Sequence, residues 1–173
     1  VGVTTNISFL KKAKVKNYKE FAKKAIESVG GKPISFQVFN DDPIALEKQA
    51  REITSWGDNV YVKIPVVLPN GKSTVTLIKR LAEEGLRINI TSVYTKEQIK
   101  EIYNANIKNI KTLIVSVFCG RINDTGADAI GIIKFANSLF ENDATKETLW
   151  AGCQRVRDIL DAEKCGTDII TVP

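Results

Sequence analysis

The stretch Val60-Tyr61-Val62-Lys63-Ile64-Pro65 decides the fold class of this chain. Its apolar residues occupy consecutive positions, which is typical of strands that are covered on both faces in a parallel sheet. Similar β-branched runs recur along the whole chain, with starts 20 to 36 residues apart. They predict seven parallel strands: Val1–Thr5, Ile34–Phe39, Val60–Val67, Arg87–Tyr94, Thr112–Phe118, Thr148–Cys153 and Asp168–Val172.

Amphipathic helical segments fill the intervals between these runs. Asp42 and Pro43 indicate a helix start, Gly85 indicates a helix end, and Thr95-Lys-Glu-Gln98 has the pattern of a capping box. The predicted helices are Tyr18–Val29, Ile44–Trp56, Val75–Glu84, a helix that opens at Thr95, Ala129–Phe140 and Val156–Ala162. No linker or shift in composition divides the chain, so one domain is expected over residues 1–173.

This alternation of strands and helices fits either an open doubly wound sheet or a barrel of eight βα units. A complete barrel needs an eighth strand and usually about 200 residues or more. The chain has 173 residues, seven predicted strands and no Met. We therefore expect a TIM (β/α)8 barrel that lacks its first strand and first helix, as a single domain that is incomplete at both ends.

The composition excludes several classes of function. The absence of His excludes Ser-His-Asp and Cys-His nucleophiles and every His-ligated metal site. Three widely spaced cysteines favour reduced thiols in a cytoplasmic protein over a disulfide framework or a metal clip. No run of 18 apolar residues and no signal peptide is present, so no membrane partner is expected. The net charge of +5 favours an anionic partner, but only weakly.

Lys63 is the principal candidate for chemistry. Lysine is rare in strands and is almost never fully buried without a partner, yet this one lies between Val62 and Ile64. Desolvation would lower its pKa and leave some free amine near neutral pH, which is the form that attacks a ketone or aldehyde. The alternative is a lysine at a strand end whose ammonium reaches solvent.

Arg121 and Arg155 form a second candidate site. Each follows a predicted strand at the edge where barrel enzymes place their reacting groups and often a substrate phosphate. Guanidinium groups bind phosphate through two parallel hydrogen bonds. The alternative is a pair of ordinary surface arginines. The lysine-rich segment from Lys11 to Lys24 is better explained as a solvated helix face than as a nucleic-acid site, because Glu20 interrupts it.

Five motifs, in order along the chain, give it a specific resemblance to the transaldolase family. They are Gly2-Val-Thr-Thr-Asn6, Val62-Lys-Ile-Pro65, Asn89-Ile-Thr91, Phe118-Cys-Gly-Arg-Ile-Asn-Asp124 and Gly166-Thr-Asp-Ile-Ile-Thr-Val-Pro173. The chain most resembles the short-chain branch that also contains the fructose-6-phosphate aldolases. The resemblance implies a (β/α)8 barrel and a lysine Schiff base. It also implies transfer of a dihydroxyacetone unit from a ketose phosphate to an aldose phosphate, with no metal or organic cofactor.

Carried over by position, the resemblance implies three catalytic residues. Lys63 is the nucleophile, Thr91 helps to hold the catalytic water, and Gln37 occupies the position where transaldolases usually have a water-activating Glu. The substrate-binding positions are Asn6 at the donor hydroxyls, Ser116 and Phe118 along the site, and Arg121, Cys153 and Arg155 near the phosphate. The branch commonly forms rings of subunits, so a homo-oligomer is expected, with sugar phosphates of the pentose phosphate pathway as substrates.

Several positions depart from the family's pattern and leave three hypotheses open. The family's catalytic Asp lies on the expected missing strand, Ile7 replaces a usual Pro, and Cys153 replaces a usual Ser. Phe118 is typical of the transaldolases, whereas Gln37 is typical of the aldolases. The leading hypothesis is a transaldolase, the second is an aldolase that releases free dihydroxyacetone, and the third is a homologue that has lost catalysis.

Overall fold

A computed structural model describes residues 2–108 and 110–173, so Val1 of the first predicted strand lies outside the described residues. The seven strands form one sheet in sequence order, every neighbouring pair is parallel, and β1 and β7 are its two edges. This confirms the predicted parallel sheet. The strands are β1 Val3–Thr4, β2 Ile34–Gln37, β3 Val60–Pro65, β4 Ile88–Val93, β5 Leu113–Val117, β6 Lys146–Trp150 and β7 Ile169–Ile170.

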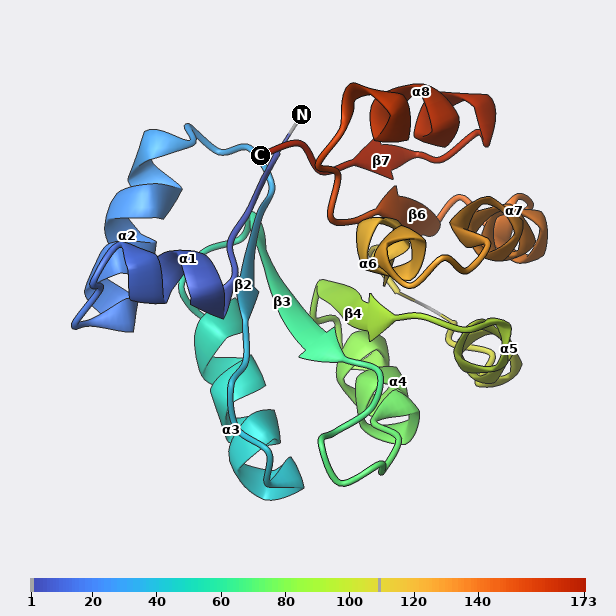
Figure 1. Cartoon of the computed structure of the whole chain (residues 1–173). Helices are drawn as coiled ribbons and strands as arrows, with labels where there is room; N and C mark the ends of the chain where they lie inside the picture. Colours follow the sequence, from blue (N-terminus) through green and yellow to red (C-terminus); the bar gives the residue numbers. More distant parts are fainter. Residues whose placement is uncertain (1, 109) are drawn as a thin grey trace.

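The sheet curls into an incomplete barrel with the longer helices around its outer side (Figure 1). The eighth strand and first helix of a complete barrel stay a prediction. The six predicted helices are all present, and two short ones, α1 and α6, were not predicted. The helices are α1 Ile7–Lys12, α2 Tyr18–Ser28, α3 Pro43–Thr54, α4 Val75–Glu83, α5 Lys96–Asn104, α6 Cys119–Asp124, α7 Ala129–Phe140 and α8 Val156–Lys164.

The predicted helix boundaries rest on the expected local chemistry. The Asp42 side chain accepts a hydrogen bond from the Ala45 amide at 2.9 Å, and Pro43 is the first residue of α3. Thr95 and Gln98 form a reciprocal capping box at the start of α5. Gly85 follows α4 with a φ of 96°, a conformation that glycine adopts without strain. The capping signals in the sequence are therefore confirmed.

Both faces of the sheet are buried, which is why the strands are apolar on consecutive positions. The outer face packs against the helices in one large apolar core that includes Phe36, Val62, Ile64 and Trp150. The inner face has an apolar layer of its own, with Phe118 and Ile169 packed against it: Tyr61, Ile114, Leu149 and Ala151. Burial on both faces is what a barrel wall requires.

The sixth strand corrects the sequence prediction. It spans Lys146–Trp150 instead of Thr148–Cys153, so Cys153 lies in the loop that follows the strand. Gly152 has a φ of 79°, which takes the backbone out of the extended conformation. The loops after β5 and β6 then meet closely, because a Cβ on Gly120 would lie 1.8 Å from the Gly152 carbonyl oxygen. The consecutive apolar residues up to Cys153 gave no signal of this turn.

No helix within residues 2–108 and 110–173 has the length and apolar character needed to cross a membrane.

Candidate active site

Lys63 lies on β3 with its side chain on the inner face of the curled sheet. The residue is only 8% exposed, and its Nζ donates a hydrogen bond to the Thr5 carbonyl oxygen at 3.2 Å. Burial lowers the pKa of Lys63 to about 8 from its ordinary value of 10.5, and no carboxylate contributes to the shift. Roughly a tenth of this side chain is therefore free amine at pH 7, far more than for an ordinary lysine. The burial expected of Lys63 is observed, and its role as a nucleophile stays a prediction.

The strand register explains why a lysine can occupy this position. Gln37 on β2 and Asn89 on β4 are the register neighbours of Lys63, so the three residues share one face of the sheet. The adjacent residues Val62 and Ile64 point to the opposite face and are fully buried in the outer core. The apolar flanks of Lys63 thus anchor the strand, while the inner face is left for polar groups.

A chain of buried polar side chains lies on the same inner face. Ser116 donates a hydrogen bond to the Asn89 Oδ1 at 2.7 Å, and the Asn89 amide donates to the Ser35 Oγ at 3.3 Å. The Thr5 hydroxyl donates to the Ser35 carbonyl oxygen at 3.0 Å. Through Thr5 this network reaches Lys63. Ser116 was predicted as a site residue, whereas Ser35 was missed, although a polar residue between two buried apolar ones was a usable signal.

Thr91 is two residues after Asn89 on β4, nearer the carboxyl end of the strand, and it is the register neighbour of Pro65 on β3. It is 1% exposed, and its hydroxyl has no hydrogen-bond partner within the described part of the chain. A buried hydroxyl without a partner is costly unless a water or a substrate group satisfies it. The geometry of Thr91 therefore suits the predicted contact with a catalytic water.

Gln37 ends β2 and is half-buried. Its backbone carbonyl accepts a hydrogen bond from the Tyr18 hydroxyl at 3.1 Å, and burial raises the pKa of Tyr18 to about 12. The backbone of Gln37 is thereby fixed, and its side chain is on the Lys63 face. An amide can orient water but cannot remove its proton, so Gln37 is a hydrogen-bonding group rather than a base.

Asn6 follows β1 and caps α1, because its side-chain oxygen accepts a hydrogen bond from the Phe9 amide at 2.8 Å. Its side-chain NH2 group remains available for the predicted hydrogen bonds to the hydroxyl groups of the donor substrate. The neighbouring residue Thr5 accepts the hydrogen bond from Lys63, so the chain places Asn6 next to the amine. Capping and substrate binding are therefore compatible uses of this side chain.

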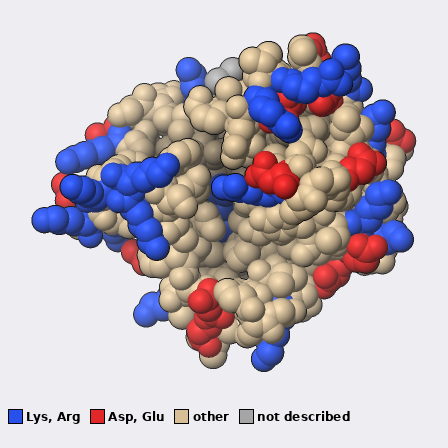
Figure 2. Space-filling view, viewed as in Figure 1, with Lys and Arg blue, Asp and Glu red and all other residues tan. Residues whose placement is uncertain are grey.

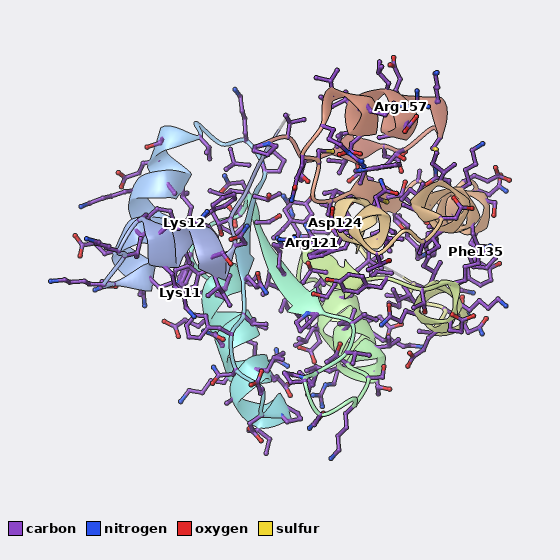
Figure 3. All side chains as sticks on the ribbon, in the orientation of Figure 1. Lys11, Lys12, Arg121, Asp124, Phe135 and Arg157 are labelled. Atoms are coloured by element: carbon purple, nitrogen blue, oxygen red, sulfur yellow. The ribbon has the colours of Figure 1, made fainter. Side chains whose placement is uncertain are left out.

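The two predicted phosphate ligands lie in neighbouring segments that follow β5 and β6, at the carboxyl ends of the strands. Arg121 is on α6 after β5, and Arg155 is the residue before α8, after β6. The Gly120 amide donates to the Ala151 carbonyl at 3.1 Å, which joins the two loops. Figure 3 labels Arg121 and Asp124 together near the middle of the molecule, and Figure 2 shows basic and acidic groups side by side there.

Both arginines already have carboxylate partners. Arg121 pairs with Asp124 at 3.3 Å, and Arg155 pairs with the buried Asp158 at 2.9 Å. Their side chains remain 62% and 61% exposed, so each guanidinium keeps donors that face solvent. The Asp158 carboxylate also accepts hydrogen bonds from two backbone amides, at Gln154 and Arg155. These contacts hold the arginines at the edge of the sheet where a phosphate could approach them.

Phe118 and Cys153 follow β5 and β6 at the same end of the sheet. Phe118 packs on the inner apolar layer and offers no hydroxyl. Cys153 is 3% exposed, and burial raises the pKa of its thiol to about 11, so it stays protonated at neutral pH. A buried thiol is a weak hydrogen-bond donor, which makes Cys153 a poorer phosphate ligand than the predicted family residue, serine.

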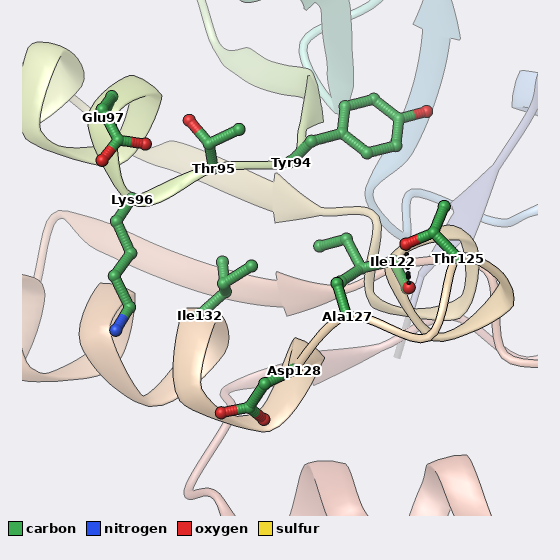
Figure 4. A pocket seen from close by; sticks show the side chains of 9 residues that line it. All are labelled: Tyr94, Thr95, Lys96, Glu97, Ile122, Thr125, Ala127, Asp128 and Ile132. Atoms are coloured by element: carbon green, nitrogen blue, oxygen red, sulfur yellow. Dashed lines mark hydrogen bonds between the residues drawn. The ribbon is translucent and has the colours of Figure 1, made fainter.

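A cavity of about 520 Å³ lies beside the site rather than in it (Figure 4). None of the predicted site residues lines it. Its wall is formed by the start of α5 and by the segment from α6 to α7: Tyr94, Thr95, Lys96, Glu97, Ile122, Thr125, Ala127, Asp128 and Ile132. Among residues 2–108 and 110–173, no three Cys, Asp or Glu side chains gather as a metal site.

A curled parallel sheet with a buried lysine of lowered pKa on its inner face is an arrangement suited to aldolase-type chemistry. The model of the family described as transaldolase/fructose-6-phosphate aldolase matches residues 1–173. The chain therefore belongs to the transaldolase/fructose-6-phosphate aldolase family, and it is an aldolase-type enzyme. The predicted family resemblance is confirmed.

Curated relatives agree with this assignment, and a solved structure resembles the fold. A probable transaldolase of Thermoanaerobacter sp. (strain X514) is 32% identical over 173 residues, which cover 99% of this chain and 75% of that protein. A probable transaldolase of Nitrosopumilus maritimus is 29% identical over 174 residues, with 99% and 73% covered. A mandelate oxidase structure is 17% identical, with a TM-score of 0.58 over 90% of this chain. This chain spans 52% of that oxidase, and the likeness concerns the fold alone.

Proposed function

We propose that this enzyme transfers a dihydroxyacetone unit from a ketose phosphate to an aldose phosphate through a Schiff base on Lys63. The observation that carries the proposal is the buried amine of Lys63, whose pKa is lowered to about 8. Such an amine is a nucleophile at neutral pH, because a larger share of it is unprotonated than for an ordinary lysine. The family assignment supports the same chemistry.

The reaction begins with attack of the Lys63 Nζ on the ketone carbon of the donor. The carbinolamine loses water to give an iminium ion, which then accepts the electron pair of the breaking carbon–carbon bond. The donor's far fragment leaves as an aldose phosphate, and its hydroxyl proton passes to a base. The nucleophilic carbon that remains attached to Lys63 adds to the carbonyl of a second aldose phosphate, and the new alkoxide oxygen takes the proton back from that base. Water then hydrolyses the new iminium and releases the product and the free amine.

The other candidate site residues are proposed to support these steps. The unpartnered hydroxyl of Thr91 holds the water that enters and leaves at the iminium carbon. The Asn6 and Gln37 amides hydrogen-bond donor hydroxyls and water, respectively. Arg121 and Arg155 bind the phosphate with their solvent-facing donors, because charge-assisted hydrogen bonds from guanidinium to phosphate are strong.

Turnover of fructose 6-phosphate, measured with and without erythrose 4-phosphate, tests this proposal. If the enzyme is a transferase, turnover of fructose 6-phosphate should require the added aldose phosphate. Equal turnover in both conditions would replace it with the second candidate, an aldolase that releases dihydroxyacetone, which Gln37 favours. No turnover and no imine in either condition would favour the third hypothesis, a homologue without catalysis.

A further inference from the structure

Tyr94 lines the cavity beside the site and packs against Phe118, the cap residue of α6. It follows β4 directly, lines the cavity of about 520 Å³, and is 39% exposed. Its ring centroid lies 5.4 Å from that of Phe118, with the planes tilted by 57°. In Figure 4 the hydroxyl of Tyr94 points away from Thr95 and Lys96. Tyr94 is therefore an aromatic residue at the catalytic edge of the sheet to which sequence analysis assigned no role.

The backbone around Tyr94 directs this side chain. Ser92 has a φ of 59°, and the β4–β5 register shifts between Ile90 and Val93. Irregularities of this kind redirect a side chain and are frequent next to active sites. The Tyr94 amide then donates a hydrogen bond to the Gln98 side-chain oxygen at 2.7 Å, which ties the residue to α5. The position of Tyr94 is thus set by specific contacts.

Two contacts join this segment to the residues near Arg121. The Phe118 amide donates a hydrogen bond to the Val93 carbonyl at 2.9 Å, and Phe118 is the cap residue of α6, which carries Arg121. Ile122, the neighbour of Arg121 on that helix, lines the same cavity as Tyr94. The ring of Tyr94 therefore lies against the cap residue of α6, three positions before Arg121.

The chemistry of the Tyr94 hydroxyl suits a donor to an anion. Burial raises the pKa of Tyr94, and the positive charge of Arg121 opposes this rise only in part. The phenol therefore keeps its proton at neutral pH. No hydrogen bond from this hydroxyl occurs within the described part of the chain, so the proton is available to a ligand.

We infer that the Tyr94 hydroxyl donates a hydrogen bond to the substrate phosphate beside Arg121 and contributes to selection of phosphorylated sugars. The inference rests on the proposed function, because it takes the phosphate subsite from Arg121. It adds a neutral donor to that subsite. A phenol beside an arginine binds a phosphate without adding a second positive charge, so the Asp124–Arg121 pair can stay in place.

The replacement Tyr94→Phe isolates this role, because it removes one oxygen and keeps the ring contact with Phe118. We expect kcat/KM for fructose 6-phosphate to fall by about tenfold, mainly through a higher KM, as for loss of one hydrogen bond to a charged group. Reaction with unphosphorylated dihydroxyacetone should be unchanged. Inorganic phosphate should also become a weaker competitive inhibitor, which a merely structural role of Tyr94 would not produce.

Tyr103→Phe is the matched control. Tyr103 lies on α5, is 49% exposed, and also packs its ring against a phenylalanine, Phe140, at 6.1 Å. Its replacement should alter neither substrate. Equal loss with both substrates in Tyr94→Phe, or no change in KM and phosphate inhibition, would overturn the inference.

Arg121→Ala, assayed in parallel, separates this inference from the proposed function. If Arg121→Ala impairs phosphorylated substrates selectively and Tyr94→Phe does not, only the role of Tyr94 is wrong. If neither replacement affects the phosphate preference, the proposed phosphate subsite itself is wrong.

Discussion

The Lys63 Nζ donates a hydrogen bond to the Thr5 carbonyl oxygen at 3.2 Å, and the two residues are 58 positions apart in the sequence. This contact places the amine beside the end of β1, directly before Asn6, the cap residue of α1. It satisfies one donor of the amine without supplying a negative charge. The amine is therefore hydrogen-bonded and oriented, while burial still favours its neutral form.

The pH dependence of imine formation follows from this environment. With a pKa of about 8, roughly a tenth of Lys63 is free amine at pH 7. We expect the rate of imine formation to rise with pH and to reach half its plateau near pH 8. Stopped-time borohydride trapping between pH 6 and pH 10 measures this rate. A midpoint near the ordinary lysine value of 10.5 would show that the amine is solvated in the working enzyme.

The burial of Lys63 should also cost stability. Its pKa is about 8 when folded and 10.5 when unfolded, so protonation favours the unfolded state fully below pH 8. The shift corresponds to about 3 kcal/mol. We expect Lys63→Met to raise the free energy of unfolding at pH 7 by about 2 kcal/mol, after subtraction of about 1 kcal/mol for the lost hydrogen bond to Thr5.

Urea unfolding of both proteins between pH 7 and pH 10.5 measures this effect. The excess free energy of unfolding of the Met variant should shrink as pH rises from 8 to 10.5. In this range only the unfolded wild-type protein binds the proton of Lys63, so higher pH destabilises its unfolded state. Lys12→Met, at an exposed position on α1, is the control and should change little. A destabilised Met variant would contradict the predicted penalty.

Replacement of either proposed phosphate ligand should act on phosphorylated substrates. We expect Arg121→Ala and Arg155→Ala each to lower kcat/KM by roughly tenfold to a hundredfold, as for loss of about 1.5–3 kcal/mol. Asp158 keeps two backbone donors in Arg155→Ala, so the fold should persist. Arg157→Ala is the control, because Arg157 pairs with Asp161 on the same helix. Equal losses with unphosphorylated dihydroxyacetone would assign the arginines to the scaffold.

Phe118 should influence whether the enzyme transfers or releases its three-carbon unit. Its ring packs on the inner layer and provides no proton. A hydroxyl at this position could orient water or donate a proton to the carbon attached to Lys63. We therefore expect Phe118→Tyr to increase release of dihydroxyacetone relative to transfer, measured as turnover without an added aldose. An unchanged ratio would show that residue 118 does not control the partition.

Much of the fold could be predicted from the sequence because the strands are buried on both faces. Runs such as Val60–Pro65 are apolar except at Lys63, and caps such as Asp42 and Thr95 mark the helix starts. The short helices α1 and α6 were missed because six residues provide too little periodicity. The end of β6 was missed because a glycine with positive φ cannot be recognised from an apolar run.

The candidate site was predictable only where a residue conflicts with its surroundings. Lys63 is such a residue, because an amine within an apolar strand has a clear physical cost. Ser35 also lies between two apolar residues, but the partner that gives it a role, Asn89, is on another strand and is known only from the register. The carboxylate partner of Arg121 is Asp124 at the end of α6, and that of Arg155 is Asp158 in the first turn of α8; neither pair was predicted from the sequence.

The most direct test of the account is to locate the covalent intermediate. The protein is incubated with fructose 6-phosphate, reduced with borohydride and digested, and the peptides are analysed by mass spectrometry. The account predicts a reduced sugar adduct on the peptide that contains Lys63, and its loss in Lys63→Met, whereas Lys12→Met keeps it. An adduct on another lysine, or no adduct at any pH between 6 and 10, would contradict the proposed Schiff base on Lys63.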